Sequence, residues 1–252
     1  MGLFGVAIQI GSLSIRWYGI MIVLAMIFGV WWACFEARRQ HQDVEKMFDL
    51  CLLLLPCAII GARVYYVLTH LSEYDNFWEI FKVWEGGLAI HGGILLCIAA
   101  AYIYVRRHNI SFWRWTDILV PGVIVGQAIG RMGNYFNGEL YGPVTDLPWA
   151  MYIAGAYRHP TFLYEIICNL ISFGILLFLM KRPHRQGEIF SWYLILYSTG
   201  RFFIEFLRVD KVMLGEFPIP GSGIVSLACI AIGIGLLFFL RRYPKINVYA
   251  KH

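Results

Sequence analysis

The stretch ILVPGVIVGQAIGRMGNYFNGELYG, residues 118–142, joins an apolar run to a dense group of polar side chains. Its first part, up to Ile129, is long and apolar enough to make most of a membrane crossing. The part that follows places four glycines, two asparagines, Arg131 and Glu139 within thirteen residues. Glycine allows close approach of a ligand, and arginine, asparagine and glutamate offer many hydrogen bonds. A connector between helices does not need this density, so the stretch favours an enzyme over a bundle of anchors.

The rest of the chain is equally apolar. Of its 252 residues, 59% are hydrophobic and only 15% are charged, whereas roughly a quarter of the residues of a soluble domain are charged. Long apolar runs recur along the sequence and predict an all-α polytopic membrane protein, since a helix satisfies its own backbone in lipid. We expect one integral membrane domain over residues 1–252, with about seven transmembrane helices near 17–35, 48–69, 88–105, 116–132, 162–180, 189–207 and 223–240.

The basic residues predict how these spans are oriented. Most of them follow the first, third, fifth and seventh spans, and the positive-inside rule places those ends in the cytoplasm. They are Arg38, Arg39 and Lys46; Arg106, Arg107 and Arg114; Lys181, Arg182 and Arg185; and Arg241, Arg242, Lys245 and Lys251. We therefore expect the N-terminus outside, the C-terminus in the cytoplasm, and a small extracytoplasmic head in the connection at about 133–161. This anchoring explains the net charge of +5, which gives no sign of nucleic-acid binding.

The six cysteines give no sign of a metal site. All of them lie within or at the edge of apolar spans, without CxxC spacing and without a clustered histidine. Structural zinc sites and disulfide frameworks both have characteristic cysteine spacings. We therefore interpret these residues as small buried thiols and predict no metal.

Costly polar residues recur at one predicted depth. An ionisable side chain inside the membrane costs about 2.5–3.5 kcal/mol on insertion scales, so each one needs a partner or a task. Arg63 would lie roughly 22 Å into the second span, which begins inside. Six elements bring polar groups to the same level, near the outer leaflet: Tyr18, Arg63, His91, Arg131, His159, and Arg201 with Glu205. This agreement predicts a common site.

Two interpretations of the intramembrane arginines are open. Arg201 and Glu205 have i,i+4 spacing and could form an ion pair that locks two helices together, in a polar stripe that also contains Tyr197. Alternatively, Arg131 and Arg201 bind an anionic headgroup, because a guanidinium group can hold phosphate by two parallel hydrogen bonds. Arg63 could snorkel, stabilise the bundle or contact the substrate.

The remaining candidate site residues also have both a structural and a functional interpretation. His91 could be an ordinary polar residue at a helix end, or could accept a proton as neutral imidazole, with the Gly-Gly pairs on either side clearing space for a substrate. Glu139 could carry charge in the site or brace the glycine-rich turn. Asn134 and Asn137 could orient phosphate or glycerol hydroxyls, or cap loop backbone. A transporter of anionic lipid is a rival function, although the sequence has no repeat and its polar groups gather toward one face.

Several motifs, in order along nearly the whole chain, resemble those of bacterial prolipoprotein diacylglyceryl transferases. The most specific is Gly130–Gly142, in which Met132 and Tyr135 are small departures from the family pattern. The other motifs are Arg16–Gly19, Gly61–Val64, His91–Gly93, His159–Glu165 and Gly200–Arg208.

The resemblance implies a multi-pass enzyme of the bacterial cytoplasmic membrane, with seven spans, an external N-terminus, and neither a metal nor an organic cofactor. Its partners would be phosphatidylglycerol, among the other membrane lipids, and the signal peptide of a prolipoprotein. The sn-1,2-diacylglyceryl group would move to the thiol of the lipobox cysteine, which forms a thioether and releases glycerol 1-phosphate.

The polar residues take definite roles under this hypothesis. Arg131 is expected to bind the headgroup of phosphatidylglycerol. Arg131 is also a catalytic candidate, because the leaving phosphate gains charge and a fixed guanidinium group stabilises that charge. Further contacts with the headgroup, beside Arg131, are expected from Asn134, Asn137, Glu139 and Gly142.

A second group of residues would complete the reaction site. Arg201 is expected to clamp the phosphate or the leaving group, oriented by Glu205 and Tyr197. His91 is expected to be the base that deprotonates the thiol, or else a donor to the headgroup. Further substrate contacts are assigned to Tyr18, Arg63 and His159. A lateral opening between helices is expected to admit the two-chain lipid.

Overall fold

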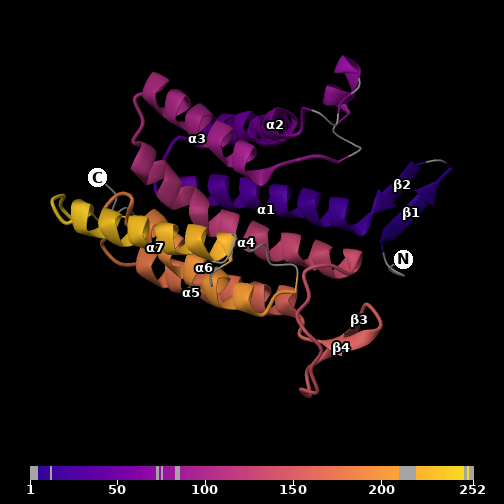
Figure 1. The fold of residues 1–252 in the computed structure, drawn as a ribbon. Helices are drawn as coiled ribbons and strands as arrows, with labels where there is room; N and C mark the ends of the chain where they lie inside the picture. The colour runs from indigo at the N-terminus through magenta and orange to yellow at the C-terminus, as the bar shows by residue number, and fades with distance from the viewer. Residues whose placement is uncertain are drawn as a thin grey trace. The chain divides into compact units, whose positions relative to one another are not determined.

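The fold consists of long helices (Figure 1), as the apolar runs predict. The computed structural model describes residues 5–11, 13–71, 74, 76–82, 86–209, 220–246 and 249, so Lys251 of the orientation argument lies outside the described residues. Each predicted span coincides with one helix, which confirms the polytopic all-α class. The helices are α1 (Trp17–Arg39), α2 (Val44–Thr69), α3 (Ile90–Arg107), α4 (Phe112–Asn137), α5 (Thr161–Met180), α6 (Glu188–Phe206) and α7 (Gly221–Leu240).

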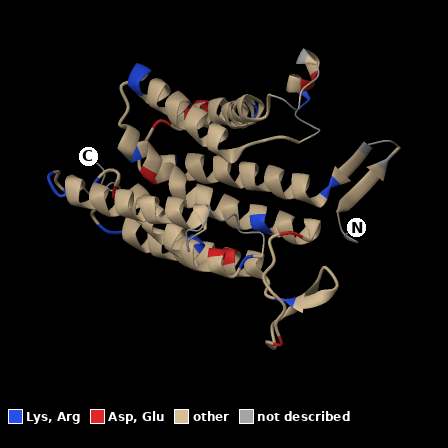
Figure 2. Ribbon diagram, viewed as in Figure 1, with Lys and Arg blue, Asp and Glu red and all other residues tan. Residues whose placement is uncertain are grey.

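The helices differ in how apolar they are. Among the described residues, α1, α2, α3, α5 and α7 are long and apolar enough to cross a membrane. Helices α4 and α6 are also long, but α4 contains Asp117 and Arg131, and α6 contains Arg201 and Glu205. Figure 2 shows this distribution as mostly tan helices with blue and red segments together on parts of α5 and α6. The side of the membrane that each terminus faces stays a prediction.

Two short β-hairpins add to the helices and were not foreseen. Strands β1 (Val6–Ile10) and β2 (Leu13–Arg16) pair antiparallel ahead of α1, and β3 (Met151–Ile153) pairs with β4 (Ala156–Arg158) in the predicted head. The β3–β4 turn consists of Ala154 and Gly155, both with positive φ (49° and 83°). Two-residue hairpin turns of this kind match the twist of the strands that they join. Strands this short leave only a weak pattern in the sequence.

The chain forms two compact units, and the larger consists of residues 1–32 and 116–252. Its hydrophobic core lies where α4, α5 and α6 meet, at Val120, Ile124, Leu176, Met180 and Ile189. Burial of side chains of this size stabilises a fold by about 1.5–3 kcal/mol each in water, although dispersion and close packing carry more of the stabilisation in lipid. This core fixes the three helices on which the polar residues of the larger unit lie.

A buried carboxylate of α4 determines where α6 begins. Asp117 is 2% exposed and accepts hydrogen bonds from the backbone N–H groups of Gly187 (2.6 Å) and Phe190 (2.8 Å). The first N–H groups of a helix have no partner within the helix, so a side-chain acceptor stabilises the helix start. Here the acceptor comes from another helix, which ties the start of α6 to α4.

The smaller unit, residues 33–115, is organised by the contact between α2 and α3. Gly92 and Gly93 are buried in this contact. A Cβ on Gly92 would collide with the carbonyl oxygen of Gly61 and with Tyr65, and one on Gly93 would lie 2.8 Å from the carbonyl oxygen of Ala58. Small residues at a helix crossing let two backbones approach closely, as is common in membranes. The glycines after His91 therefore pack helices, and our interpretation that they clear space for a substrate is wrong.

Candidate functional site

A single carboxylate links two of the predicted arginines. Glu165 on α5 lies 2.5 Å from Nε of Arg131 on α4 and accepts a hydrogen bond of 2.6 Å from Nη1 of Arg201 on α6. The Glu165 side chain is 4% exposed, while those of Arg131 and Arg201 are 21% and 17% exposed. Three consecutive helices, α4, α5 and α6, therefore meet at one buried charge.

The ion pairs continue along α6. The second guanidinium nitrogen of Arg201 lies 2.8 Å from Oε2 of Glu205, as the i,i+4 spacing predicts. Arg208 Nη1 lies 3.7 Å from the same carboxylate oxygen. We refer to Arg131, Glu165, Arg201, Glu205 and Arg208 as the arginine–glutamate cluster. It holds three guanidinium groups against two carboxylates, so it carries a net positive charge.

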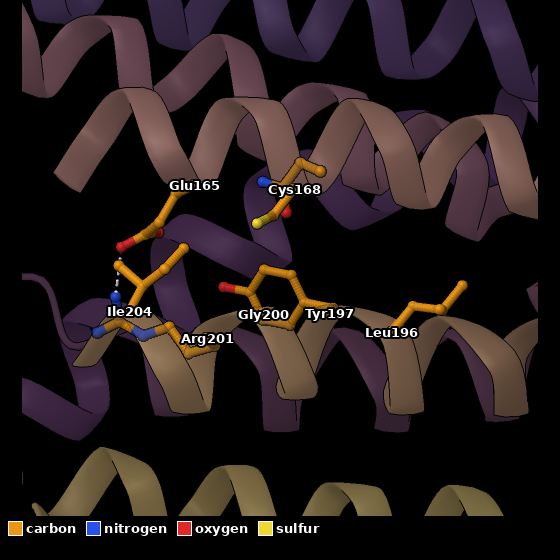
Figure 3. Close-up of a pocket in the computed structure, with 8 residues that line it drawn as sticks. Glu165, Cys168, Leu196, Tyr197, Gly200, Arg201 and Ile204 are labelled. Carbon is orange, nitrogen blue, oxygen red and sulfur yellow. Dashed lines mark hydrogen bonds and ion pairs between the residues drawn. The ribbon is translucent and has the colours of Figure 1, made fainter. Parts of the chain in front are cut away.

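A small cavity lies beside the cluster. Its volume is about 10 Å³, roughly the space of one water molecule. Figure 3 shows Glu165 and Arg201 facing each other at one end of this cavity, with the hydroxyl group of Tyr197 directed toward the same end. Asn169 also lines the cavity, is 4% exposed, and its Nδ2 has no hydrogen-bond partner among the described residues. The cavity thus offers donors from α5 and α6 in a low-dielectric setting.

Two further candidates lie close to Arg131. Asn134, one helical turn after Arg131, accepts a long hydrogen bond of 3.4 Å from Nη1 of Arg131. Tyr18 at the start of α1 packs on Gly133, because a Cβ there would lie 2.7 Å from Cδ2 of the tyrosine ring. Asn134 therefore lies beside Arg131, as the sequence predicts, and Tyr18 packs on the residue two positions after Arg131.

Asn137 and Glu139 lie where α4 ends, and both are exposed. The predicted span ends at about residue 132, but the helix continues to Asn137. Asn137 Nδ2 donates to Glu139 Oε1 at 2.6 Å. The backbone N–H of Glu139 donates to the carbonyl oxygen of Asn134 at 3.1 Å. Of the two roles considered for Glu139, the geometry supports the one that braces the turn.

Gly142 and His159 hold the connection between α4 and α5 in place. The buried Gly142 donates from its backbone to the carbonyl oxygen of His159 at 2.8 Å, and a Cβ on it would lie 2.7 Å from the carbonyl oxygen of Leu207. His159 Nδ1 lies 3.1 Å from the hydroxyl oxygen of Tyr164. Trp149 donates to that hydroxyl from its indole nitrogen at 2.9 Å. These contacts fix the chain at the start of α5, four residues before Glu165.

Arg63 lies in the smaller unit and has backbone partners. It is 8% exposed and donates to the carbonyl oxygens of Glu79, Ile80 and Gly86 at 2.7 Å each, and to that of Gly87 at 3.1 Å. Its guanidinium carbon also lies 5.4 Å from the ring centre of Tyr74. These carbonyls belong to the connection that contains a short 3₁₀ helix, Phe77–Phe81. Of the interpretations of Arg63, this geometry favours stabilisation of the bundle.

His91 also belongs to the smaller unit, in the first turn of α3. Its side chain is exposed, and its ring centre lies 6.2 Å from that of Tyr65. An exposed imidazole remains accessible to a ligand, which a catalytic base requires. Because His91 belongs to the smaller unit and Arg131 to the larger one, the approach of His91 to Arg131 stays a prediction.

Glu165 and Asn169 were not predicted as site residues from the sequence. Glu165 stands inside the His159–Glu165 motif and is the one charged residue of α5. A carboxylate within an otherwise apolar span is a signal of function by itself, because its burial is costly without a partner. Asn169 follows Glu165 by four residues and so lies on the same face of the helix. Both could have been found by this reasoning.

Comparisons with known proteins agree with the motifs. The model of the prolipoprotein diacylglyceryl transferase family matches residues 5–239. A phosphatidylglycerol–prolipoprotein diacylglyceryl transferase of Listeria monocytogenes serotype 4a is 41% identical over 249 residues, which cover 94% of this chain and 89% of the relative. The enzyme of the same name from Thermosynechococcus vestitus is 42% identical, with 94% and 92% covered. That of Clostridium botulinum strain Langeland is 40% identical, with 95% and 98% covered.

Proposed function

Since the chain belongs to the prolipoprotein diacylglyceryl transferase family and catalyses the first step of lipoprotein maturation in the bacterial cytoplasmic membrane, we propose that the arginine–glutamate cluster binds the phosphate of phosphatidylglycerol. The observation that carries this proposal is the pairing of Arg131 and Arg201 with one shared carboxylate, Glu165. Two guanidinium groups from different helices are thereby held near each other before any lipid arrives.

The reaction needs positive charge at this point. The sulfur atom of the prolipoprotein cysteine, as thiolate, forms a bond to the glyceryl carbon of phosphatidylglycerol. The bond between that carbon and the phosphate oxygen breaks, and glycerol 1-phosphate leaves with the bonding electrons. The phosphate gains negative charge as the bond breaks, so fixed guanidinium groups stabilise the transition state more than the bound lipid. The net positive charge of the cluster suits this task.

The carboxylates have a role in the same proposal. An arginine that is buried in a membrane without a partner is costly, and Glu165 and Glu205 lower this cost before the lipid binds. They also hold each guanidinium group in a fixed direction, so less orientational freedom is lost when the phosphate binds. When a phosphate arrives, it competes with these carboxylates for the same donors. Glu165 and Glu205 are therefore positioning residues in this scheme.

The thiol of the lipobox cysteine needs a base or a positive field, because its ordinary pKa of about 8.5 leaves it mostly protonated at neutral pH. We assign His91 to this task, supported by its exposed ring and its place in the motif His91–Gly93. Tyr18, Asn134 and Tyr197 would surround the headgroup. Gly142 and His159 would act indirectly, by holding the backbone between α4 and α5 that positions Glu165.

The experiment is a transfer assay in bilayers, with phosphatidylglycerol labelled in its acyl chains and a lipobox peptide as acceptor. The unaltered protein is expected to label the peptide, and a peptide with serine in place of the lipobox cysteine is expected to stay unlabelled. Arg131→Lys keeps the charge but cannot form the two parallel hydrogen bonds, so it is expected to lose roughly 10²-fold or more in rate. A rate near that of the unaltered protein would overturn the assignment of Arg131 to the phosphate.

A further inference from the structure

A second cavity lies at the other end of α6, where the start of this helix faces the end of α7. Its volume is about 220 Å³, much larger than the cavity beside Arg201. The lining combines charged and apolar side chains: Arg185, Glu188, Trp192, Leu237, Leu240 and Arg241. None of these residues takes part in the arginine–glutamate cluster.

The position of this cavity separates it from the reaction. Glu188 precedes Arg201 by thirteen residues on the same helix, which corresponds to about 20 Å along the helix axis. The hydrocarbon core of a membrane is about 30 Å thick. The cavity and the arginine–glutamate cluster therefore lie toward opposite leaflets, whichever way the chain is inserted.

The two arginines of the cavity differ in their partners. The guanidinium group of Arg185 already has partners within the protein: its Nε donates to the carbonyl oxygen of Tyr243 at 2.7 Å, and its Nη1 lies 3.8 Å from Glu188. The guanidinium group of Arg241 has no hydrogen bond or ion pair with the residues that the structure describes, and its central carbon lies 4.5 Å from the ring centre of Phe238. The charged side chains of the cavity, two arginines and one glutamate, therefore have a net positive charge, and the guanidinium group of Arg241 is available to donate hydrogen bonds to a ligand.

The apolar part of the lining suits a lipid rather than a small solute. Leu237 and Leu240 come from α7, the helix with the highest hydropathy among the candidate spans. Trp192 contributes a large ring with one N–H donor, and tryptophan favours the boundary between lipid and water. Neighbouring side chains of α7 such as Ile234 and Phe238 are exposed, as expected for a surface that faces lipid. A ligand here meets charge at one end and hydrocarbon at the other.

We propose that this cavity binds the phosphodiester headgroup of an anionic phospholipid from the leaflet opposite to the arginine–glutamate cluster. The guanidinium group of Arg241 donates to the phosphate, and the carboxylate of Glu188 accepts from a headgroup hydroxyl. The acyl chains lie along Trp192 and Leu237. The bound lipid joins the start of α6 to the end of α7, so it stabilises the helix that carries Arg201 without entering the reaction.

The neighbouring residue Arg242 provides a matched control. It has the same charge, it follows Arg241 directly, and its guanidinium carbon lies 5.5 Å from the ring of Phe239. It does not line the cavity. Generic attraction of lipid to basic residues at a helix end would depend on both arginines alike, whereas a specific site depends on Arg241 alone.

The test compares Arg241→Gln with Arg242→Gln in the full chain, purified in detergent. Native mass spectrometry counts the phosphatidylglycerol molecules that each protein retains, and phosphatidylcholine with the same acyl chains serves as the zwitterionic comparison. A third variant, Trp192→Phe, keeps an aromatic side chain but replaces the indole with a smaller ring that has no N–H donor. Inorganic phosphate is titrated separately, to learn whether the anion alone fills the site.

Arg241→Gln is expected to retain one lipid fewer, with about tenfold weaker binding, because it loses a charge-assisted hydrogen bond. Arg242→Gln is expected to bind as the unaltered protein does, Trp192→Phe more weakly, and phosphatidylcholine and inorganic phosphate weakly in every case. Equal loss in both arginine variants would overturn the proposal in favour of generic surface attraction. Equal retention of phosphatidylcholine, or unchanged retention in Arg241→Gln, would overturn it as well. Because both variants keep the arginine–glutamate cluster, these results are independent of the proposed reaction site.

Discussion

Arg63 and Arg201 are both arginines inside long helices, but they have different partners. Arg63 donates four hydrogen bonds to backbone carbonyl oxygens of the connection before α3. Arg201 contacts two carboxylates, Glu165 and Glu205. A carbonyl oxygen is part of the chain and stays where the fold puts it. A carboxylate in a cluster with excess positive charge is a partner that a phosphate can replace.

Structural and functional arginines in a membrane differ in the partners that hold them. Depth in the membrane does not separate the two kinds, because both arginines have partners that offset the free-energy cost of their burial. The type of partner does. Neutral carbonyls leave the positive charge of Arg63 enclosed by a loop, whereas the arginine–glutamate cluster contains three guanidinium groups and two carboxylates. We therefore expect an anionic substrate at the second group and a structural tie at the first.

The largest difference between the two arginines is expected when each is replaced by lysine in a separate variant. Arg201→Lys is expected to lower diacylglyceryl transfer by roughly 10²-fold or more, because one ammonium group cannot serve two partners and a phosphate with the same geometry. Arg63→Lys is expected to lower stability by about 1–3 kcal/mol through lost hydrogen bonds, with a smaller effect on the rate. Transfer rates and thermal unfolding in detergent measure the two effects. If Arg63→Lys slows transfer as much as Arg201→Lys at unchanged stability, Arg63 contacts substrate.

A second variant tests whether the cluster is held together by its carboxylates. Glu165→Gln removes the charge shared by Arg131 and Arg201 while it keeps nearly the same shape. Removing one partner of a buried ion pair costs about 3–5 kcal/mol, so we expect a clear drop in the unfolding temperature. We also expect a changed KM for phosphatidylglycerol, because the competing carboxylate is lost. Glu36→Gln, in the smaller unit, is a matched control: it removes another buried carboxylate paired with an arginine and should leave KM unchanged. Unchanged stability and KM in Glu165→Gln would contradict the bridging role.

The smallest effect is expected at the exposed end of α4. Glu139→Gln keeps an oxygen that can accept from Asn137, and both side chains are exposed. We therefore expect a stability change within about 0.5 kcal/mol and a rate close to that of the unaltered protein. A large loss of transfer at unchanged stability would show that the charge of Glu139 acts on the substrate, which was the other interpretation of this residue.

The sequence predicted the helices well because each one has an apolar run as its signature. It also predicted that Arg131, Arg201 and Glu205 share a depth, since depth follows from distance along a span. It missed the two hairpins, whose strands of three to five residues are too short to show a pattern. It also missed Glu165: the single charge of α5 is visible in the sequence, but its pairing with Arg131 and Arg201 is a tertiary contact.

By itself, the sequence determined the class of protein, the helices and the identity of the motifs, because hydropathy and residue type are local properties. Only the tertiary structure decided which residues meet. It placed Glu165 between Arg131 and Arg201, directed Arg63 to loop carbonyls, and buried Gly92 against Gly61. Each of these contacts depends on how a helix is rotated and where it crosses its neighbour. Rotation and crossing result from the packing of all side chains together, and no single segment of the sequence contains that information.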